Sequence, residues 1–460
     1  MQEFQRTRLP VLAFLCLLFV TVELLSGLIP PFSSLDEFTH IKRAYQLSRG
    51  DVLPKTVDGV EGGYIDEGLI EFMSYFDKMP SHYDRKVDRQ TLSASKKVQW
   101  SHTTRFSEFP NTVTYFPLIY VPQASAMLLG RKFGLSVSDS YVLARLFSLV
   151  ATLVFLGLAF STLPMPPVVM ALFLLPMTLF QLASASLDAV AFGIMTLSCS
   201  LFMRSVTDER FRGAWPQAAL FTCLLSLITS RPNLVPLAIL PAVSFVRYPR
   251  RYFLFSSVAL FTAWVSWLAC VKFTVPELGP PQDLTSGQIA YYYVSHPLAL
   301  LHVVAATIGT REALSIYWAS FVGNLGWDDS INPGMEIPFG ILLLALAIIS
   351  LQRRRAALLS LEALSLDAVA VSSTVLMFLM ELVTWTHHPA ETIYGLQGRY
   401  FLPIVVLLSF SILSRPLSQR QWTLSALVLF FMLSLSVITM EPRLLRRYWI
   451  DDTTTQILVQ

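Results

Sequence analysis

The sequence predicts an all-α fold, a polytopic membrane helix bundle of about 11 transmembrane helices. Hydrophobic residues make up 54% of the 460 residues and charged residues only 14%, whereas soluble domains carry about 25% charged residues. The mean hydropathy is +0.55. Apolar segments that approach membrane-spanning length recur along the whole chain. They cover residues 9–29, 140–161, 166–183, 187–204, 214–230, 233–246, 252–272, 337–352, 366–386, 400–414 and 421–440.

Arginine residues indicate which connections face the cytoplasm, because cytoplasmic loops of membrane proteins are enriched in Lys and Arg. If Val113–Gly130 were counted as a span, most of these arginines would lie outside, so we expect this segment to lie at the outer face. The N-terminus is then inside and the C-terminus outside. The predicted cytoplasmic connections hold Arg204, Arg210, Arg212, Arg247, Arg250, Arg251, Arg353, Arg354, Arg355, Arg415 and Arg420, and the short outer connections hold only Arg231 and Arg399.

This topology gives one integral membrane domain, residues 1–440, and a short tail, residues 441–460. Two large loops face outside: residues 30–139, which we expect to carry surface helices, and residues 273–336. The net charge of +3 and the lack of a basic run interleaved with aromatics argue against nucleic-acid binding. The tail carries Arg443, Arg446 and Arg447 on the outer side, which the charge rule does not favour.

An acidic pair, Asp36-Glu37, follows the first predicted span. Carboxylates next to lipid are costly, so they usually face a polar cavity or a partner. Residues Phe38–Gly50 have the pattern of a helix on the surface, with apolar residues on one face and Lys42, Arg43, Gln46 and Arg49 on the other. Ser34 and Glu37 have the spacing of a capping box. That role would occupy Glu37 and leave the carboxylate of Asp36 free to face a cavity.

Ionisable residues inside the predicted spans concentrate toward the outer face. A charge at the bilayer centre costs about 2.5–3.5 kcal/mol on insertion scales, so such residues usually line a cavity or pair with one another. We therefore expect a cavity that opens to the outside. The outer-half residues are Glu23, Arg145, Asp188 and Glu381, and Asp367 is the exception near the inner face.

The last outer loop holds a second candidate site around Arg399. Gly395 and Gly398 bracket Gln397 and allow close backbone approach. Arg399 stays charged and can grip a phosphate group through two parallel hydrogen bonds. The alternative is an arginine that extends to lipid headgroups beside Tyr400, a residue type typical of the membrane interface.

No cofactor follows from the residues. All seven histidines lie in the predicted outer loops. A divalent metal ion held by Asp36, His40 and His387 or His388 is conceivable, but no ligand spacing supports it, so we predict no metal ligands.

Two sets of short motifs carry a resemblance to known proteins. The first set comprises Asp36-Glu37 with His40 downstream, the segment Tyr115–Pro122 with its two prolines, Ala144-Arg145 and Ser186-Leu187-Asp188. It resembles the C-type glycosyltransferase superfamily, which includes the protein mannosyltransferases and the aminoarabinose transferase of lipid A. The second set comprises Asn324-Leu325-Gly326-Trp327 and the segment Gly395–Pro403. It narrows the resemblance to a bacterial family of polytopic membrane proteins named only as a domain of unknown function.

The resemblance implies a C-type glycosyltransferase fold with Asp36 as the catalytic base, Asp188 as a second acidic site and Arg399 at the lipid phosphate. Glu37 would share the catalytic centre. Leu35 stands where many of these enzymes carry proline, and we expect no counterpart of the C-terminal domain that binds peptide in oligosaccharyltransferases. The acceptor is therefore expected to be a glycan or a lipid. The candidate substrate-binding residues are His40, Arg43, Arg145, Gln397, Arg399 and Tyr400.

Three functions are compatible with this sequence. The first is an inverting glycosyltransferase of the bacterial inner membrane that uses a polyprenyl-phosphate-linked sugar on the outer face. The second is a transporter or flippase of lipid-linked solutes, which would place polar groups near the bilayer midplane between internal repeats. The third is a non-catalytic membrane protein of polysaccharide assembly, since a fold does not imply an activity. The outward cluster of acidic residues favours the first.

Overall fold

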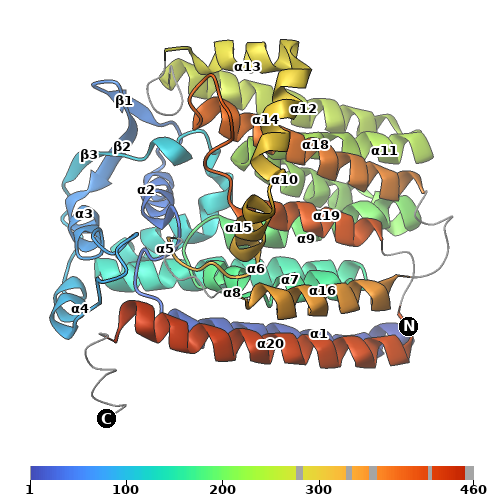
Figure 1. Ribbon diagram of the computed structural model, residues 1–460, viewed down its shortest axis with the longest axis horizontal. Coiled ribbons are helices and arrows are strands. Elements are labelled where there is room, and N and C mark those ends of the chain that lie inside the picture. Colours follow the sequence, from blue (N-terminus) through green and yellow to red (C-terminus); the bar gives the residue numbers. More distant parts are fainter. Residues whose placement is uncertain (1, 276–282, 328–333, 352–359, 413–416, 451–460) are drawn as a thin grey trace.

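The computed structural model describes residues 2–275, 283–327, 334–351, 360–412 and 417–450. Long helices run side by side along one axis, and a small sheet with short helices gathers at one end of them (Figure 1). Within the described residues, five helices are long and apolar enough to cross a membrane singly. They are α6 (Val137–Thr162), α9 (Asp188–Thr207), α12 (Arg251–Thr274), α18 (Leu361–Thr384) and α20 (Gln419–Tyr448).

Shorter helices complete the bundle. The apolar ones are the part Pro10–Ser26 of α1 (Gln2–Ser26), α10 (Ala214–Ser230), η4 (Pro232–Ile239) with α11 (Leu240–Arg247), α16 (Glu336–Ser350), and η5 (Gly398–Phe401) with α19 (Leu402–Ser411). The expected span 166–183 is instead two short helices, α7 (Pro167–Leu172) and α8 (Pro176–Leu182), because Pro176 cannot continue a preceding helix. Every expected apolar segment is thus helical, but the helix lengths do not establish 11 spans.

Helix α9 forms the centre of the bundle. In its most apolar window 89% of the residues are buried, against 17% for α12, which therefore presents most of its surface outward. Small residues permit this packing: a Cβ at Gly193 of α9 would lie 3.1 Å from the Thr152 methyl group of α6. The residue that begins α9 is Asp188.

The first outer loop is more structured than expected and contains a sheet that the sequence analysis did not predict. Strands β1 (Lys55–Val57), β2 (Val60–Asp66) and β3 (Thr104–Glu108) form an antiparallel sheet in that order. In its register Gly62 of β2 lies opposite Glu108 of β3. The same loop contains α2 (Glu37–Ser48), α3 (Glu67–Ser74), α4 (Arg89–Ser95), η1 (Pro110–Thr112), η2 (Pro117–Tyr120) and α5 (Val121–Lys132).

Only part of the ambiguous segment 113–130 is α-helical. Helix α5 has 12 residues, which is about 18 Å at 1.5 Å per residue. A bilayer core is about 30 Å thick. The length of α5 therefore fits the expectation that this segment does not cross.

The second outer loop, residues 273–336, is also helical. It contains α13 (Ser286–Ser295), α14 (Pro297–Ile308) and α15 (Arg311–Val322). Helices α13 and α14 meet at an angle of 101° and together are long and apolar enough to count as a sixth, broken span. This pair lies beside the chain that follows α18: Ile393 N donates to Thr307 Oγ1 over 2.9 Å.

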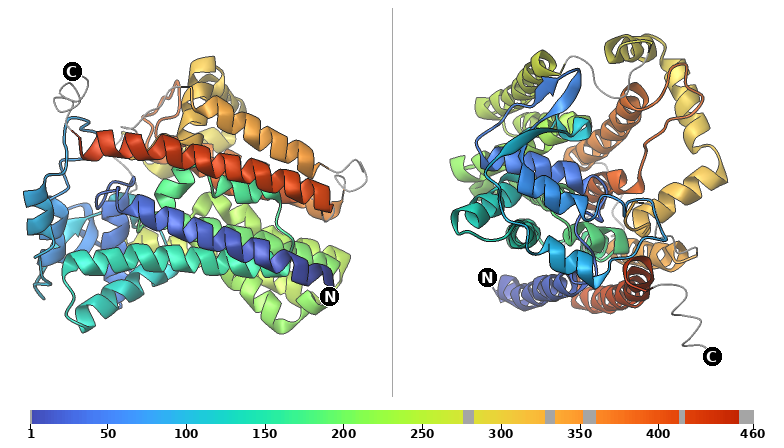
Figure 2. Two further views of the ribbon diagram at one scale, coloured as in Figure 1. Left: turned by 90° about the horizontal axis from the view of Figure 1, so that it is seen from below. Right: turned by 90° about the vertical axis from the view of Figure 1, so that its left-hand side faces the viewer.

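The last helix continues beyond residue 440, where the tail was expected to begin. Helix α20 continues from the predicted span to Tyr448 and lies alongside α1, which runs in the same direction (Figures 1 and 2). Arg447 is buried and donates to the backbone oxygens of Met79 and Arg85, and Arg443 donates to Gly323 O over 3.1 Å. Arg443 and Arg447 therefore anchor the end of α20 to Gly323 and to the segment 79–85.

The basic connections gather at one end of the bundle. Arg204 Nε donates to the oxygen of Thr162 at the end of α6. Tyr252 at the start of α12 donates to Arg212 O over 2.7 Å, and Arg247 at the end of α11 lies 3.8 Å from Glu362 at the start of α18. The sheet and helix α2, which begins at Glu37, lie at the opposite end (Figure 1). Predictions involving residues 353–355 and 415 lie outside the described residues.

A buried charge cluster fixes α2 to the bundle. Glu37 accepts hydrogen bonds from Tyr141 Oη over 2.8 Å and from Ala185 N over 2.7 Å. Arg145 Nε lies 3.6 Å from the same carboxylate, and its other nitrogens donate to the backbone oxygens of Ile29 and Pro30. This cluster joins the end of α1, the start of α2, α6 and the approach to α9.

The predicted capping box forms only in part. Ser34 N donates to Glu37 Oε2 over 3.3 Å, which is one of the two expected bonds. The other does not form, because α2 begins at Glu37 with Asp36 at the N-cap, and the Ser34 hydroxyl donates to Gln181 Oε1 instead. Ser34 therefore links the loop to α8.

The basic connections at one end of the bundle predict that this end faces the cytoplasm. We expect reporter fusions after Arg212 and Arg251 to report cytoplasm and fusions near Ser95 and Gly287 to report the outside. Paired alkaline phosphatase and green fluorescent protein fusions measure this. A fusion at Arg251 that reports the outside would reverse the orientation and place the acidic pair in the cytoplasm.

Removal of Glu37 should destabilise the protein. Glu37→Ala leaves Arg145 buried without its carboxylate partner, and breaking such a pair costs about 3–5 kcal/mol. We expect a clearly lower melting temperature in detergent, with Glu71→Ala on the exposed face of α3 as the matched control. Equal melting temperatures for the two variants would show that the Glu37 cluster does not stabilise the fold.

Candidate functional site

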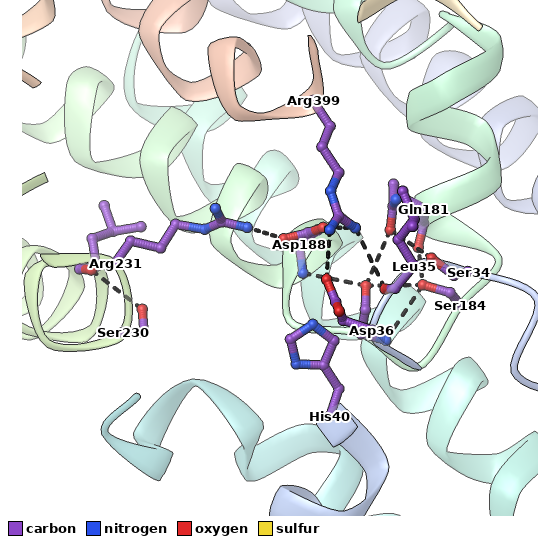
Figure 3. Close-up of polar contacts among 12 residues, drawn as sticks. Ser34, Leu35, Asp36, His40, Gln181, Ser184, Asp188, Ser230, Arg231 and Arg399 are labelled. Atoms are coloured by element: carbon purple, nitrogen blue, oxygen red, sulfur yellow. Dashed lines mark hydrogen bonds and ion pairs between the residues drawn. The ribbon is translucent and has the colours of Figure 1, made fainter. Parts of the chain in front are cut away.

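A cavity of about 200 Å³ lies where the outer loops meet the bundle, at the end opposite the basic connections. Side chains from α2, α9, α18 and η5, and from the loops beside them, form its walls. Charged and polar groups dominate these walls, as Figure 3 shows for Asp36, Asp188, Arg231 and Arg399. The lining residues are Asp36, His40, Asn111, Thr112, Tyr115, Leu187, Asp188, Arg231, Glu381, Trp385, Gly395, Gln397, Arg399 and Tyr400.

Asp36 is held in an uncommon backbone conformation. Its φ is 61°, in the left-handed region that aspartate tolerates better than most non-glycine residues. The Asp36 oxygen accepts bonds from the Thr39 and His40 amides, so the residue caps the first turn of α2 through its backbone. The Asp36 carboxylate therefore does not cap the helix and faces the cavity. Its Oδ1 accepts a hydrogen bond from Asn111 Nδ2 over 2.7 Å, and its Oδ2 accepts one from Arg399 over 2.7 Å.

Two arginines and two aspartates alternate in one ion-pair chain (Figure 3). Arg399 bridges Asp36 and Asp188, at 2.7 Å and 3.2 Å. Asp188 also pairs with Arg231, which directly follows α10. Because Asp188 is the first residue of α9, the positive end of the helix dipole further stabilises its negative charge. Each charge in the chain therefore has an opposite charge as its neighbour.

The surroundings set the protonation states of Asp36 and His40. Burial alone would raise the pKa of Asp36, but the Arg399 guanidinium and the Asn111 hydrogen bond lower it below the usual value. Asp36 is therefore ionised at neutral pH. Burial lowers the pKa of His40 to about 3, so the imidazole that pairs with Tyr120 Oη at 2.7 Å is uncharged. The two arginines thus supply the positive charge of this ion-pair chain.

Four lining residues each have a buried polar atom that no described residue hydrogen-bonds. Leaving such an atom without a partner costs about 1–3 kcal/mol, which favours a ligand that supplies the missing bonds. Two of the atoms are N–H donors and two are oxygen acceptors. They are Arg231 Nε, Arg399 Nε, Asn111 Oδ1 and Gln397 Oε1.

Six of the nine candidate site residues line the cavity: Asp36, His40, Asp188, Gln397, Arg399 and Tyr400. The other three do not. Glu37 and Arg145 belong to the buried cluster beneath α2. Arg43 is fully buried and donates to Gln46 Oε1 and to the oxygens of Val52 and Tyr115.

The buried position of Arg43 shows that the expected solvent-exposed polar face of α2 was wrong. Arg43 and Gln46 were expected at the surface, but both are buried, because the β-sheet and the 110–120 segment cover that side of the helix. A Cβ at Gly63 of β2 would clash with the Gln46 side chain. Arg43 positions Tyr115, and through it one wall of the cavity.

Eight further lining residues were not among the predicted site residues, and three of them carry a charged or amide side chain: Asn111, Arg231 and Glu381. Glu381 was recognised as an outward-lying charge, and Arg231 was counted as one of two arginines in the short outer connections. Their position beside Asp188 and Arg399 depends on helix packing. No pattern in the sequence distinguished Asn111, which lies in η1.

The conceivable metal site is not assembled. The described residues contain no group of three or more His, Cys, Asp or Glu side chains placed to hold a metal ion. His388 packs edge-on against Tyr292 and Tyr293 of α13, and His40 pairs with Tyr120.

Comparison with known proteins gives a family. No curated protein and no solved structure matches the chain. A family model described as "Predicted membrane protein (DUF2142)" matches residues 18–408, which include the acidic pair, Asp188 and Arg399. The sequence motifs indicated that the chain belongs to a membrane-protein family of unknown function, and this match confirms it. The chain belongs to the DUF2142 family of predicted membrane proteins.

Proposed function

We propose that this protein is an inverting glycosyltransferase that moves a sugar from a polyprenyl-phosphate donor to a glycan or lipid acceptor on the outer face of the bacterial inner membrane. The observation that carries the proposal is the ion pair of Asp36 and Arg399, 2.7 Å apart, in the wall of the cavity. It combines a carboxylate base with a cation suited to a phosphate leaving group. Its place at the end opposite the basic connections supports an outward-facing site.

The two arginines would bind the lipid phosphate. Arg399 and Arg231 both line the cavity, and each keeps an unpaired Nε–H. The chain of two aspartates and two arginines is electrically balanced, so an incoming phosphate has to compete with a carboxylate for a guanidinium. We expect it to displace Asp36 from Arg399. Displacement would remove the contact that holds the pKa of Asp36 low and would make Asp36 a stronger base when the donor is bound.

The chemical step follows from this arrangement. The Asp36 carboxylate removes the proton of an acceptor hydroxyl, whose oxygen attacks the anomeric carbon of the sugar. The bond from that carbon to the phosphate oxygen breaks on the opposite face, and the polyprenyl phosphate leaves with the electron pair. A single displacement of this kind inverts the anomeric configuration. Arg399 and Arg231 stabilise the negative charge that grows on the leaving phosphate.

Asp188 would act as a positioning residue. It contacts both guanidinium groups and so holds them at the same wall of the cavity. When the phosphate displaces Asp36, Asp188 still holds Arg399 and Arg231 in place. A transporter is less compatible with this site, because transporters bind their substrates near the bilayer midplane, whereas this cluster lies at helix ends.

Asp36→Asn tests the proposal. The amide keeps the shape of the side chain but cannot accept the proton, so sugar transfer should fall by about 10²–10⁴-fold. Transfer from lipid-linked sugars is measured in membranes of a deletion strain, with equal protein levels and with restoration of the surface glycan as a second readout. Asp51→Asn, at an exposed position beyond α2, is the matched control. Near-normal transfer by Asp36→Asn would contradict the assigned base.

A further inference from the structure

Glu381 is the third carboxyl group of the cavity and the one that the proposed mechanism does not use. It lies in the last turn of α18 and lines the cavity with Asp36 and Asp188. Asp36 and Asp188 are each paired with an arginine. In the described part of the chain, the Glu381 carboxyl group has no hydrogen bond or ion pair to a side chain. Its carboxyl oxygens are therefore open to a ligand that enters the cavity.

The backbone beside Glu381 leaves space for its carboxyl group. Gly395 has a φ of +85°, and a Cβ there would lie 2.8 Å from Glu381 Oε2. The loop that carries Gly395 is fixed at three points. Tyr394 N donates to Thr386 Oγ1, Ile393 N to Thr307 Oγ1, and Gly398 N to Ser320 Oγ. The space beside Glu381 is therefore a constant feature of the cavity wall.

The neighbours of Glu381 suggest the chemistry of its partner. Gln397 lines the same wall and keeps a buried oxygen that no described residue hydrogen-bonds. Trp385 lies one turn after Glu381 and adds an indole ring to the lining. Two oxygen acceptors beside an aromatic ring fit a ligand with several hydroxyl groups on an apolar ring skeleton, which is the chemistry of a sugar.

We propose that Glu381, with Gln397, binds hydroxyl groups of the transferred sugar and sets the sugar specificity of the enzyme. This inference rests on the proposed function. With the phosphate on Arg399 and the base at Asp36, the sugar has to lie beside Arg399, in the cavity whose lining also includes Glu381. A buried acceptor that is left unpaired penalises any substrate lacking the matching hydroxyl, so the contact discriminates among sugars.

The test measures binding of two kinds of lipid to the purified full-length protein in nanodiscs. The probes are undecaprenyl phosphate and undecaprenyl phosphate carrying mannose, glucose or galactose. The wild type should bind at least one sugar-bearing lipid more tightly than the bare lipid. Glu381→Ala should lose this preference, roughly tenfold to hundredfold in affinity, and keep the affinity for undecaprenyl phosphate.

Two further variants sharpen the test. Gly395→Ala should reduce the same preference, because a Cβ there would crowd the Glu381 carboxyl group and the positive φ of residue 395 would strain the loop. Glu391→Ala, at an exposed glutamate of the same loop, should behave as the wild type. Arg399→Lys should weaken binding of both kinds of lipid, because it loses the planar two-bond grip on phosphate.

The outcomes separate the two proposals. An unchanged sugar preference in Glu381→Ala, or a wild type that binds undecaprenyl phosphate without preferring any of the three sugars, would overturn the assignment of Glu381. A wild type that binds none of the lipids would overturn the proposed function as well.

Discussion

The contact between Asp36 and Arg399 joins segments 363 residues apart in the sequence. It fixes the first outer loop against the start of α19, and Asp188 adds the central helix α9 to the same point. A buried charge without a partner destabilises a protein strongly, so the three segments have to approach one another wherever these side chains are ionised. The shape of the cavity depends on this single constraint.

Two adjacent carboxylates take different roles because α2 begins between them. The left-handed conformation of Asp36 directs its side chain to the cavity, whereas Glu37, the first helical residue, reaches the buried cluster with Arg145. The Glu37 side chain is inaccessible to solvent, whereas that of Asp36 remains 29% exposed. Glu37 thus supports the fold, whereas the adjacent Asp36 remains accessible to a ligand.

The sequence predicted the fold class because hydropathy is a strong, local signal, and the helices occur where apolar segments were expected. It also indicated Asp36, Asp188 and Arg399, because charges next to lipid are rare. It did not distinguish Arg231 from an arginine at a lipid headgroup, since only packing brings it to Asp188. The sheet was missed because β2 contains Gly62 and Gly63, residues of low strand propensity. Arg43 was misplaced because an amphipathic pattern cannot reveal that a second element covers the polar face.

The most direct test of this account is the affinity of the purified protein for undecaprenyl phosphate, compared between the wild type and Asp36→Asn. If Asp36 and the lipid phosphate compete for Arg399, removing the carboxylate charge should tighten binding by roughly tenfold, which corresponds to about 1.4 kcal/mol. Binding that is unchanged or weaker in Asp36→Asn would contradict the exchange of partners on Arg399.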